Sequence, residues 1–323
     1  MIFSKIKSPY IISEIGSNHN GDMQLCKKLI IKSKLAGANA VKFQFFSEKS
    51  LFSKIYFKKN NLNRKDIEKF SLNEKKINYI KQICKKINIQ LGFTPLGFDE
   101  VKILKKMDID FFKIASMDCN NYLLIEKVAK IKKPLIISTG LSTEREIYKA
   151  VKIAKKYNNN LSLLHCVSIY PPKNDEVNLN RLSTLKKFNT TIGFSDHCIG
   201  IDQSLASVAL GAKIIEKHFT INKKLKGWDH SMSIDYAEMK TLVEKSKKIY
   251  ASLGKKKIFR VESKNQIRLF RRSIVANKDI RKGDFFNLEN LGIKRPGNGL
   301  KTEMIEKIIG KKAKKNIKEG NLI

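Results

Sequence analysis

The chain has 323 residues, of which 42% are hydrophobic, and this is enough apolar material for one large core or two domains. It carries 65 lysines and arginines against 30 acidic residues, which gives a formal net charge of +35. Such a balance can indicate binding to nucleic acid or to an anionic membrane. The lysines are dispersed instead of clustering with aromatic residues in one arm, so we interpret the excess as compositional drift and expect no nucleic-acid partner.

The cysteines and the apolar runs indicate a compartment. The five cysteines are an odd number and contain no C-x-x-C pair, which argues against a disulfide scaffold and a structural zinc site. The amino terminus lacks the apolar segment of a signal peptide. No apolar run reaches the ~18 residues that a membrane span needs. We therefore expect a soluble, cytoplasmic protein with reduced thiols and no membrane partner.

Strand-like apolar runs alternate with amphipathic stretches along the first three-quarters of the chain. The predicted strands cover residues 10–15, 40–45, 89–93, 111–114, 134–138, 161–165, 192–194 and 214–215. Eight strand–helix units in about 250 residues are typical of a (β/α)8 TIM barrel, an α/β fold, and we predict this fold for residues 1–254. A doubly wound open sheet is the main alternative.

Three local features lie between these strands. The long connection over residues 47–70 is expected to fold over a site or to carry short elements of its own. Capping boxes are predicted at Ser71–Glu74 and Thr143–Glu146, each starting a helix. The last helix of the barrel should end at Gly254.

The pattern changes after Gly254. Residues 255–266 are basic and polar and are predicted to be a linker. The tail contains an internal repeat, because residues 276–286 and 313–323 share the scheme Ala-x-Lys-(Asp/Asn)-Ile-(Arg/Lys)-x-Gly-(Asp/Asn) followed by two apolar residues. We therefore predict a small pseudo-symmetric β-rich domain over residues 267–323, whose core is marginal alone and which packs against a barrel.

Two histidines follow two neighbouring predicted strands. His197 follows the strand at 192–194, and His218 follows the strand at 214–215. Ligands of parallel α/β folds bind beyond the carboxyl ends of the strands, so the two side chains are expected at one site. Two imidazoles there can hold a divalent metal and leave positions open for substrate.

Polar residues end several other predicted strands. Six of these residues offer ammonium charges and hydroxyl donors that suit a phosphorylated, acidic small molecule, namely Lys42, Thr94, Lys113, Ser116, Ser138 and Ser195. Five further residues suit the binding of a polyhydroxylated partner or the transfer of protons, namely Glu14, Gln44, Asp118, Tyr170 and Asp229. A lysine within an apolar strand is costly to bury unless it is paired, so Lys42 and Lys113 should have acidic partners.

Most of these residues lie in motifs that resemble the sialic acid synthase family, which includes the N-acetylneuraminate, legionaminate and pseudaminate synthases. The motifs are Glu14–Gly21, Val41–Gln44, Phe93–Pro95, Lys113–Ser116, Ile137–Gly140, Leu164–Cys166, Tyr170–Pro171, Gly193–His197, Glu216–Phe219 and Lys294–Gly299. The resemblance covers essentially the whole chain in order. It implies a barrel followed by an antifreeze-like (SAF) domain. It also implies an enzyme that condenses phosphoenolpyruvate with an N-acylated hexose to give a nine-carbon α-keto acid and phosphate.

The resemblance also implies roles for individual residues. His197 and His218 would hold Mn2+ or Mg2+. Phosphoenolpyruvate would bind to Lys42, Thr94, Lys113, Ser116, Ser138, Ser168, Tyr170 and Ser195. The sugar would bind to Gln44, Asp118, Tyr170, Asp229 and Arg295. Either Glu14 or Asp229 would be the base, and Lys113 would stabilise the departing phosphate. The chain departs from the neuraminate synthases at Asp118, where they have Glu, and at Ser168, where they have Asn.

Two further hypotheses concern chemistry and assembly. A different phosphoenolpyruvate- or pyruvate-dependent barrel, such as an aldolase, could use Lys113 to form an imine. In either enzyme the small tail domain needs a partner surface. The resemblance implies a domain-swapped homodimer in which Arg295, in the turn-rich stretch 295–299, reaches the active site of the other chain.

Overall fold

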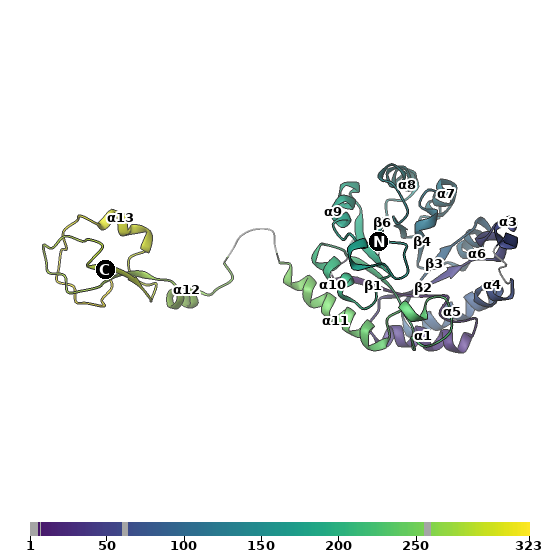
Figure 1. Cartoon of the computed structure of the whole chain (residues 1–323), viewed down its shortest axis with the longest axis horizontal. Helices are drawn as coiled ribbons and strands as arrows, with labels where there is room; N and C mark the ends of the chain where they lie inside the picture. The colour runs from purple at the N-terminus through teal and green to yellow at the C-terminus, as the bar shows by residue number, and fades with distance from the viewer. Residues whose placement is uncertain (1–5, 7, 60–63, 255–259) are drawn as a thin grey trace. The chain divides into compact units, whose positions relative to one another are not determined.

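The computed structural model describes residues 6, 8–59, 64–254 and 260–323. The chain divides into two compact units, Met1–Gly254 and Lys255–Ile323 (Figure 1). Within the stretch predicted as a linker, 255–266, the last three residues begin a helix, α12 Lys264–Phe270, whose first turn is capped by the Ser263 hydroxyl. Residues 255–259 of that linker lie outside the described residues.

The first unit is a closed barrel of parallel strands in the order β1 to β8, with β8 paired back to β1. The strands are β1 Tyr10–Gly16, β2 Ala40–Phe45, β3 Gln90–Pro95, β4 Phe111–Ile114, β5 Leu135–Ser138, β6 Leu161–Cys166, β7 Thr191–Asp196 and β8 Ile214–His218. Closure confirms the TIM barrel and excludes the open sheet. Strand boundaries differ from the predicted ones by a few residues, mainly because β3, β7 and β8 run further into the polar residues at their carboxyl ends.

Helices surround the barrel (Figure 1). They are α1 Met23–Leu35, α2 Glu48–Leu51, α3 Lys54–Lys59, α4 Arg64–Phe70, α5 Glu74–Ile87, α6 Phe98–Met107, α7 Tyr122–Ala129, α8 Glu144–Tyr157, α9 Arg181–Leu185, α10 Asp202–Ala209 and α11 Tyr236–Ser252. Three of them, α2 to α4, occupy the long connection that was expected to carry short elements. No helix among the described residues is long and apolar enough to cross a membrane.

Two of the predicted helix starts can be compared with the structure. The capping box at Thr143–Glu146 is confirmed at the start of α8. The one at Ser71–Glu74 is wrong, because α5 is capped by Asn73, whose side chain accepts a hydrogen bond from the backbone N–H of Lys76. The Ser71 hydroxyl instead donates to the carbonyl of Ile67 in the preceding helix. Serine and asparagine both cap helices well, and here the cap lies two residues beyond the predicted one.

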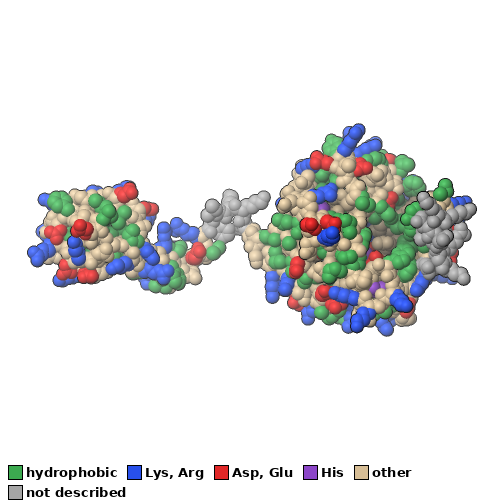
Figure 2. Space-filling view, in the orientation of Figure 1, with side chains coloured by type: hydrophobic (Ala, Val, Ile, Leu, Met, Phe, Trp, Pro, Cys, Tyr) green, Lys and Arg blue, Asp and Glu red, His purple; other side chains and the backbone are tan. Residues whose placement is uncertain are grey.

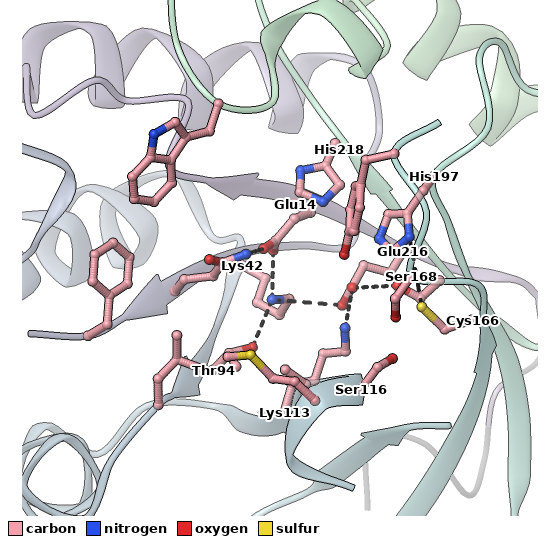
Figure 3. A pocket seen from close by; sticks show the side chains of 18 of the residues that line it. Glu14, Lys42, Thr94, Lys113, Ser116, Cys166, Ser168, His197, Glu216 and His218 are labelled. Atoms are coloured by element: carbon pink, nitrogen blue, oxygen red, sulfur yellow. Dashed lines mark hydrogen bonds and ion pairs between the residues drawn. The ribbon is translucent and has the colours of Figure 1, made fainter. Parts of the chain in front are cut away.

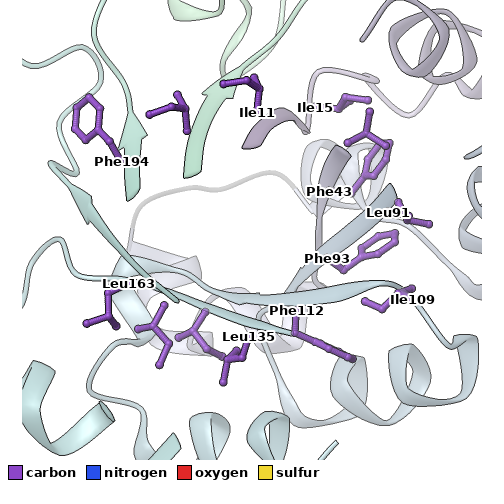
Figure 4. Close-up of a cluster of buried hydrophobic side chains, with 14 of the residues drawn as sticks. Ile11, Ile15, Phe43, Leu91, Phe93, Ile109, Phe112, Leu135, Leu163 and Phe194 are labelled. Carbon is purple, nitrogen blue, oxygen red and sulfur yellow. The ribbon is translucent and has the colours of Figure 1, made fainter. Parts of the chain in front are cut away.

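Side chains alternate between the two faces of each barrel strand. The outward residues, such as Ile11, Phe43 and Phe194, pack beneath the helices in the largest hydrophobic cluster (Figure 4). A second apolar cluster fills the barrel interior and consists of Tyr10, Ile12, Ala40, Phe111, Ile136, Leu164 and Ile214. Gly92 makes room for it, since a Cβ atom there would lie 2.1 Å from the Phe111 ring. The barrel interior below the site is therefore filled with packed side chains.

The second unit is built around an antiparallel pair, β9 Ser273–Ala276 and β10 Leu291–Lys294. It also contains the one-turn helix α13, Ile305–Ile308. The two copies of the internal repeat pair with each other in a symmetric way. Ile280 and Ile317 exchange two backbone hydrogen bonds, and the N–H of Gly283 donates to Ala313 as the N–H of Gly320 donates to Ala276. This pairing gives the small domain the pseudo-symmetry that the repeat predicts.

Candidate active site at the carboxyl ends of the barrel strands

A polar layer lies above the apolar interior of the barrel. Each strand contributes one side chain to it, namely Glu14, Lys42, Thr94, Lys113, Ser138, Cys166, Ser195 and Glu216. All eight are buried. Alternation along the strands places these residues on the same inward face as the apolar cluster, one step nearer the carboxyl ends. In TIM barrels this end of the strands carries the active site.

The charged members of this layer form one network (Figure 3). Lys42 Nζ lies 2.9 Å from Glu14 Oε2 and 4.0 Å from Glu216 Oε2, and it donates to the Thr94 hydroxyl at 2.9 Å. Lys113 Nζ donates to Glu216 Oε1 at 2.5 Å. The Ser195 hydroxyl also donates to Glu216 Oε1, at 2.9 Å. Both lysines therefore have the acidic partners that their burial requires.

Burial and charge separate the two glutamates electrostatically. Burial alone would raise the pKa of Glu216, but Lys113 and Lys42 outweigh it and lower the pKa to about 2. For Glu14, burial outweighs the attraction of Lys42, and the pKa is raised to about 7. Burial would lower the pKa of Lys113, but the carboxylate of Glu216 raises it. Near neutral pH, Glu216 and Lys113 are thus a fixed ion pair, and Glu14 is poised to exchange a proton.

A cavity of about 530 Å3 opens above this layer. The predicted site residues that line it are Glu14, Lys42, Gln44, Thr94, Lys113, Ser116, Ser168, Tyr170, Ser195, His197 and His218. Phe46, Leu51, Phe52, Leu96, Met117, Leu141 and Trp228 supply most of its apolar lining. In the space-filling view, hydrophobic side chains surround a hollow on the visible face of the barrel (Figure 2).

Four predicted site residues are not part of this lining. Ser138 is completely buried at the end of β5, and its hydroxyl has no partner among the described residues. Asp118 accepts a hydrogen bond from Asn121. Asp229 accepts one from Ser17 and lies 3.7 Å from the Nδ1 atom of His218. Arg295 belongs to the second unit, where its guanidinium lies 5.1 Å from the Phe270 ring centroid.

Two serine hydroxyls converge on the backbone of Gly140. A Cβ atom at this position would lie 2.8 Å from the hydroxyl oxygens of both Ser116 and Ser168. Neither hydroxyl has a hydrogen-bond partner among the described residues, although both atoms are buried. Buried polar groups are normally satisfied, so two unsatisfied hydroxyls in the same cavity as two ammonium groups indicate a place where an anionic ligand accepts their hydrogen bonds.

The two histidines lie next to each other at the edge of the cavity. His197 follows β7, and His218 is the last residue of β8. Their ring centroids are 5.5 Å apart, and the Tyr170 ring lies 4.1 Å from that of His197. The Nδ1 atom of His197 is 2.8 Å from the carbonyl oxygen of Val167. That hydrogen bond fixes the ring and leaves its other nitrogen for a ligand.

The residues present fit a divalent metal. The Nδ1 atom of His218 is buried without a hydrogen-bond partner, and burial lowers the pKa of this histidine to about 4, so its ring is neutral and can bind an ion. Within the described residues, no group of three His, Cys, Asp or Glu side chains is arranged to hold a metal. A metal bound here would have two imidazoles as its protein donors, and its other positions would be left for substrate oxygens and water.

A buried ion pair lies directly behind both histidines. Asp196 precedes His197, Lys217 precedes His218, and their side chains meet at 2.9 Å with almost no exposure to solvent. Asp196 also accepts hydrogen bonds from the backbone N–H of Cys198 and the hydroxyl of Ser204. On the outer face of the barrel, this pair links the ends of β7 and β8 to the start of α10.

Removing one member of this pair should destabilise the fold. Lys217→Met leaves the Asp196 carboxylate buried without a counter-ion, and we expect the free energy of unfolding in urea to fall by about 3–5 kcal/mol. Asp196→Asn combined with Lys217→Met should recover much of this loss. Lys102→Met is the matched control, because Lys102 and Asp99 are also 2.9 Å apart but exposed, and it should change stability by less than about 1 kcal/mol. Equal effects of the two single variants would contradict the assignment.

Three features of the site were missed in the sequence. Glu216 interrupts an apolar strand as Lys42 and Lys113 do, so the same burial argument predicts a charged partner for it. Cys166 lines the cavity with its sulfur 3.8 Å from His197 Nδ1. Burial would raise the pKa of the Cys166 thiol, but His197 lowers it. The apolar lining from the loops after β2, β3 and β8 gave no sequence signal that distinguishes it from core.

A TIM barrel with ionisable residues and an open cavity at the carboxyl ends of its strands has the architecture of a barrel enzyme. Comparisons with known proteins identify the family. The NeuB family matches residues 29–258, and the SAF domain matches residues 271–323.

Relatives match along nearly the whole chain. The N,N'-diacetyllegionaminic acid synthase of Campylobacter jejuni is 40% identical over 98% of this chain and 99% of its own length. The N-acetylneuraminate-9-phosphate synthase of Homo sapiens is 32% identical over 97% of this chain and 91% of its own length. The crystal structure of the N-acetylneuraminic acid synthetase of Leptospira borgpetersenii in complex with citrate superposes with a TM-score of 0.75 at 34% identity. It covers 80% of this chain and 90% of that one. The chain belongs to the NeuB family of acid synthases and is an enzyme with a carboxyl-terminal SAF domain.

Proposed function

We propose that the enzyme condenses phosphoenolpyruvate with an N-acylated hexose and water to give a nine-carbon α-keto acid and phosphate. The acceptor would be N-acetylmannosamine or a related 2,4-diacetamido sugar. The observation that carries the proposal is that Lys42 and Lys113 of the polar layer line the same cavity as the unsatisfied hydroxyls of Ser116 and Ser168. Buried ammonium and hydroxyl donors suit the phosphate and carboxylate of a small trianion. The family relatives support the same reaction class.

The site residues divide into two working groups. Lys42, Thr94, Lys113 and the serine hydroxyls would hold phosphoenolpyruvate so that its C3 atom faces the open-chain sugar aldehyde. C3 attacks the aldehyde carbon, positive charge develops at C2, and water captures it. A divalent Mn2+ or Mg2+ held by His197 and His218 would supply Lewis acidity at the sugar carbonyl.

Glu14 is the better placed of the two carboxylates considered as the base. It lines the cavity, and its pKa of about 7 lets it take a proton from the attacking water at neutral pH. Asp229, outside the lining, would instead orient His218. The C2 adduct then releases phosphate, and Lys113 stabilises the leaving charge.

The fate of the bridging oxygen tests this route. Because water attacks C2, the C2–O bond of phosphoenolpyruvate breaks and phosphate leaves with the bridging oxygen. With phosphoenolpyruvate labelled by 18O at that oxygen, we expect the label in released phosphate by mass spectrometry. Label retained in the keto acid would show attack at phosphorus instead and would overturn the mechanism.

The imine-forming aldolase is less compatible with the site. Imine formation needs a neutral amine, whereas Lys113 is held as an ammonium by Glu216 at 2.5 Å. We therefore expect borohydride with pyruvate to leave the enzyme unmodified. A nucleic-acid function is not favoured either, because lysines and arginines are scattered over the visible faces of both units (Figure 2). A cytoplasmic location stays a prediction.

We also propose that the enzyme works as a domain-swapped homodimer. Around the cavity mouth, Met117, Leu141 and Tyr170 are each more than half exposed. All three line the cavity, and exposed apolar side chains gathered at one cavity indicate a surface that is covered in the assembly. On the second unit, Arg295 has no carboxylate partner among the described residues and lies over the exposed ring of Phe270. An arginine free of local ion pairs can hydrogen-bond the acyl group of the sugar in the other chain.

Complementation tests the swapped arrangement. Arg295→Ala and His218→Ala should each be impaired as homodimers. Co-expression should restore activity, because one barrel of a mixed dimer has an intact His218 and receives an intact Arg295, giving roughly half of the wild-type rate if the sites are independent. If Arg295 acts within its own chain, both sites of a mixed dimer remain defective. No recovery in mixed dimers isolated by two different tags would refute the swap.

A further inference from the structure

The connection between β8 and α11, residues 219–235, carries a carboxylate next to one of the two histidines. Asp229 in this connection lies 3.7 Å from the Nδ1 atom of His218. Residues 221–229 are all exposed or half-buried. A segment with so little burial has few packing contacts of its own to hold it. The position of Asp229 therefore depends on hydrogen bonds from neighbouring parts of the barrel.

Asn18, in the loop after β1, joins the two ends of this connection. Its side-chain nitrogen donates to the carbonyl oxygen of Phe219 at 3.0 Å and to the hydroxyl of Ser233 at 2.8 Å. Phe219 directly follows His218. The Ser233 hydroxyl in turn donates to the carbonyl oxygen of Asp229 at 2.6 Å. One amide group thus fixes the backbone beside His218 and, through a serine, the backbone of Asp229.

Burial determines how Asn18 can act. Its side chain is completely buried and is not part of the cavity lining, so it acts on the reaction only through other residues. Its side-chain oxygen has no hydrogen-bond partner among the described residues, so the side chain serves here as a donor. Ser233 is buried as well, and water therefore does not replace these hydrogen bonds readily when they are removed.

The carboxylate of Asp229 is placed closely against the end of β1. The Ser17 hydroxyl donates to its Oδ2 atom at 3.2 Å. A Cβ atom at Gly16 would lie 3.6 Å from the same oxygen and 3.3 Å from Glu14 Oε1, so the two carboxylates lie on either side of this glycine. At 3.7 Å the Asp229 carboxylate attracts the His218 ring without forming a hydrogen bond to it. A small displacement of the connection would therefore change this interaction.

We infer that Asn18 is a positioning residue of the metal site, whose amide group holds Asp229 beside His218 and so sets the affinity of the site for its metal. This inference rests on the proposed function, in which His218 holds the metal. Groups behind a metal-binding histidine orient its ring and raise its basicity, and their loss weakens metal binding by about 10–100-fold. Asn18 acts one step further back, on the backbone that carries such a group. A purely structural Asn18 would instead affect stability and leave the metal affinity of the folded protein unchanged.

Calorimetric titration of the metal-free protein with Mn2+ tests this link. Asn18→Ala removes both hydrogen bonds and should weaken Mn2+ binding about tenfold, and excess Mn2+ should restore phosphate release. Ser233→Ala breaks only the branch to the Asp229 carbonyl and should give a smaller loss in the same direction. Asn20→Gly is the matched control, because the Asn20 amide donates to the exposed Lys226 at 2.9 Å and its φ of 51° suits glycine. This control should keep wild-type affinity. Unchanged affinity in both Asn18→Ala and Ser233→Ala, or an equal loss in the control, overturns the inference.

A double-mutant cycle identifies the residue through which Asn18 acts. In an Asp229→Asn background, Asn18→Ala should change Mn2+ affinity by less than about twofold, because the group that it positions is already lost. If Asn18→Ala does not fold, Ser233→Ala takes its place in the cycle.

The outcomes of the cycle separate the inference from the proposed function. The same loss in both backgrounds would show that Asn18 acts by another route. Lower stability of Asn18→Ala in urea with wild-type Mn2+ affinity would show a purely structural role. Either result overturns the inference and leaves the metal site and the condensation intact. Failure of the wild-type protein to bind Mn2+ would overturn the metal site and the inference together.

Discussion

Removing divalent metal from the enzyme is expected to abolish phosphate release from phosphoenolpyruvate, and Mn2+ or Mg2+ should restore it. His197→Ala and His218→Ala should each lower kcat/KM by at least ~100-fold, because each takes away one of the two imidazole donors. Calorimetric titration of the metal-free protein with Mn2+ provides a readout apart from activity. Each variant should bind Mn2+ at least ~10-fold more weakly than wild type.

A matched control separates this expectation from general damage to the barrel. His165 is the neighbouring buried histidine on β6, and its Nε2 atom is 2.7 Å from the carbonyl oxygen of Val177. His165→Gln retains a donor at that position and should keep wild-type Mn2+ affinity and metal dependence. Full activity of wild type in chelator, or unchanged Mn2+ affinity in both alanine variants, would refute the metal site.

The fold was accessible from the sequence because its signals are local. Alternating apolar runs and amphipathic stretches placed the eight barrel strands to within a few residues, and parallel pairing brings all their carboxyl ends to one side. The inward positions are two residues apart, so Lys42 and Lys113 could be recognised as buried cations from the apolar residues around them.

What could not be read from the sequence depends on register and on loops. The partner of Lys113 is Glu216, more than a hundred residues away, and their contact exists only because the barrel closes between β8 and β1. No periodicity encodes such a pairing. The same holds for the apolar lining of the cavity, since Phe46 and Trp228 come from loops after β2 and β8 and a loop aromatic has no pattern that separates a cavity lining from core.

The differences between the predicted and the observed local backbone structure have a different cause. Ser71 and Asn73 are both good helix caps, and their distance from the end of α4 decides which one is used. The linker was assigned from its basic composition, yet Ser263 caps a helix formed by the residues that follow it. The basic composition of this stretch indicates that it is exposed to solvent, but it does not determine whether the backbone is helical.

The second large effect on activity is expected from substituting Glu14 and Asp229, the two carboxylates that the sequence leaves as alternative bases. Glu14→Gln keeps the size of the side chain but removes its ability to take a proton. We expect kcat to fall by about 10²–10⁴-fold, the usual contribution of a positioned base. Added metal should not rescue this variant, because its histidines are unchanged. Asp229→Asn should lose only about 10–100-fold, and excess Mn2+ should recover much of it, since Asp229 acts on His218 from 3.7 Å.

The pH profile tests the same assignment independently. Burial raises the pKa of Glu14 to about 7, and the base must be ionised to act, so kcat/KM of wild type should rise with pH through about 7 and then level off. The Asp229→Asn variant should keep this rise, because its Glu14 still titrates, whereas the residual activity of Glu14→Gln should lack it. If instead Asp229→Asn is the more damaged variant, resists rescue by Mn2+ and loses the rise, Asp229 is the base. Glu14 would then serve only to neutralise Lys42, to which it is bound at 2.9 Å.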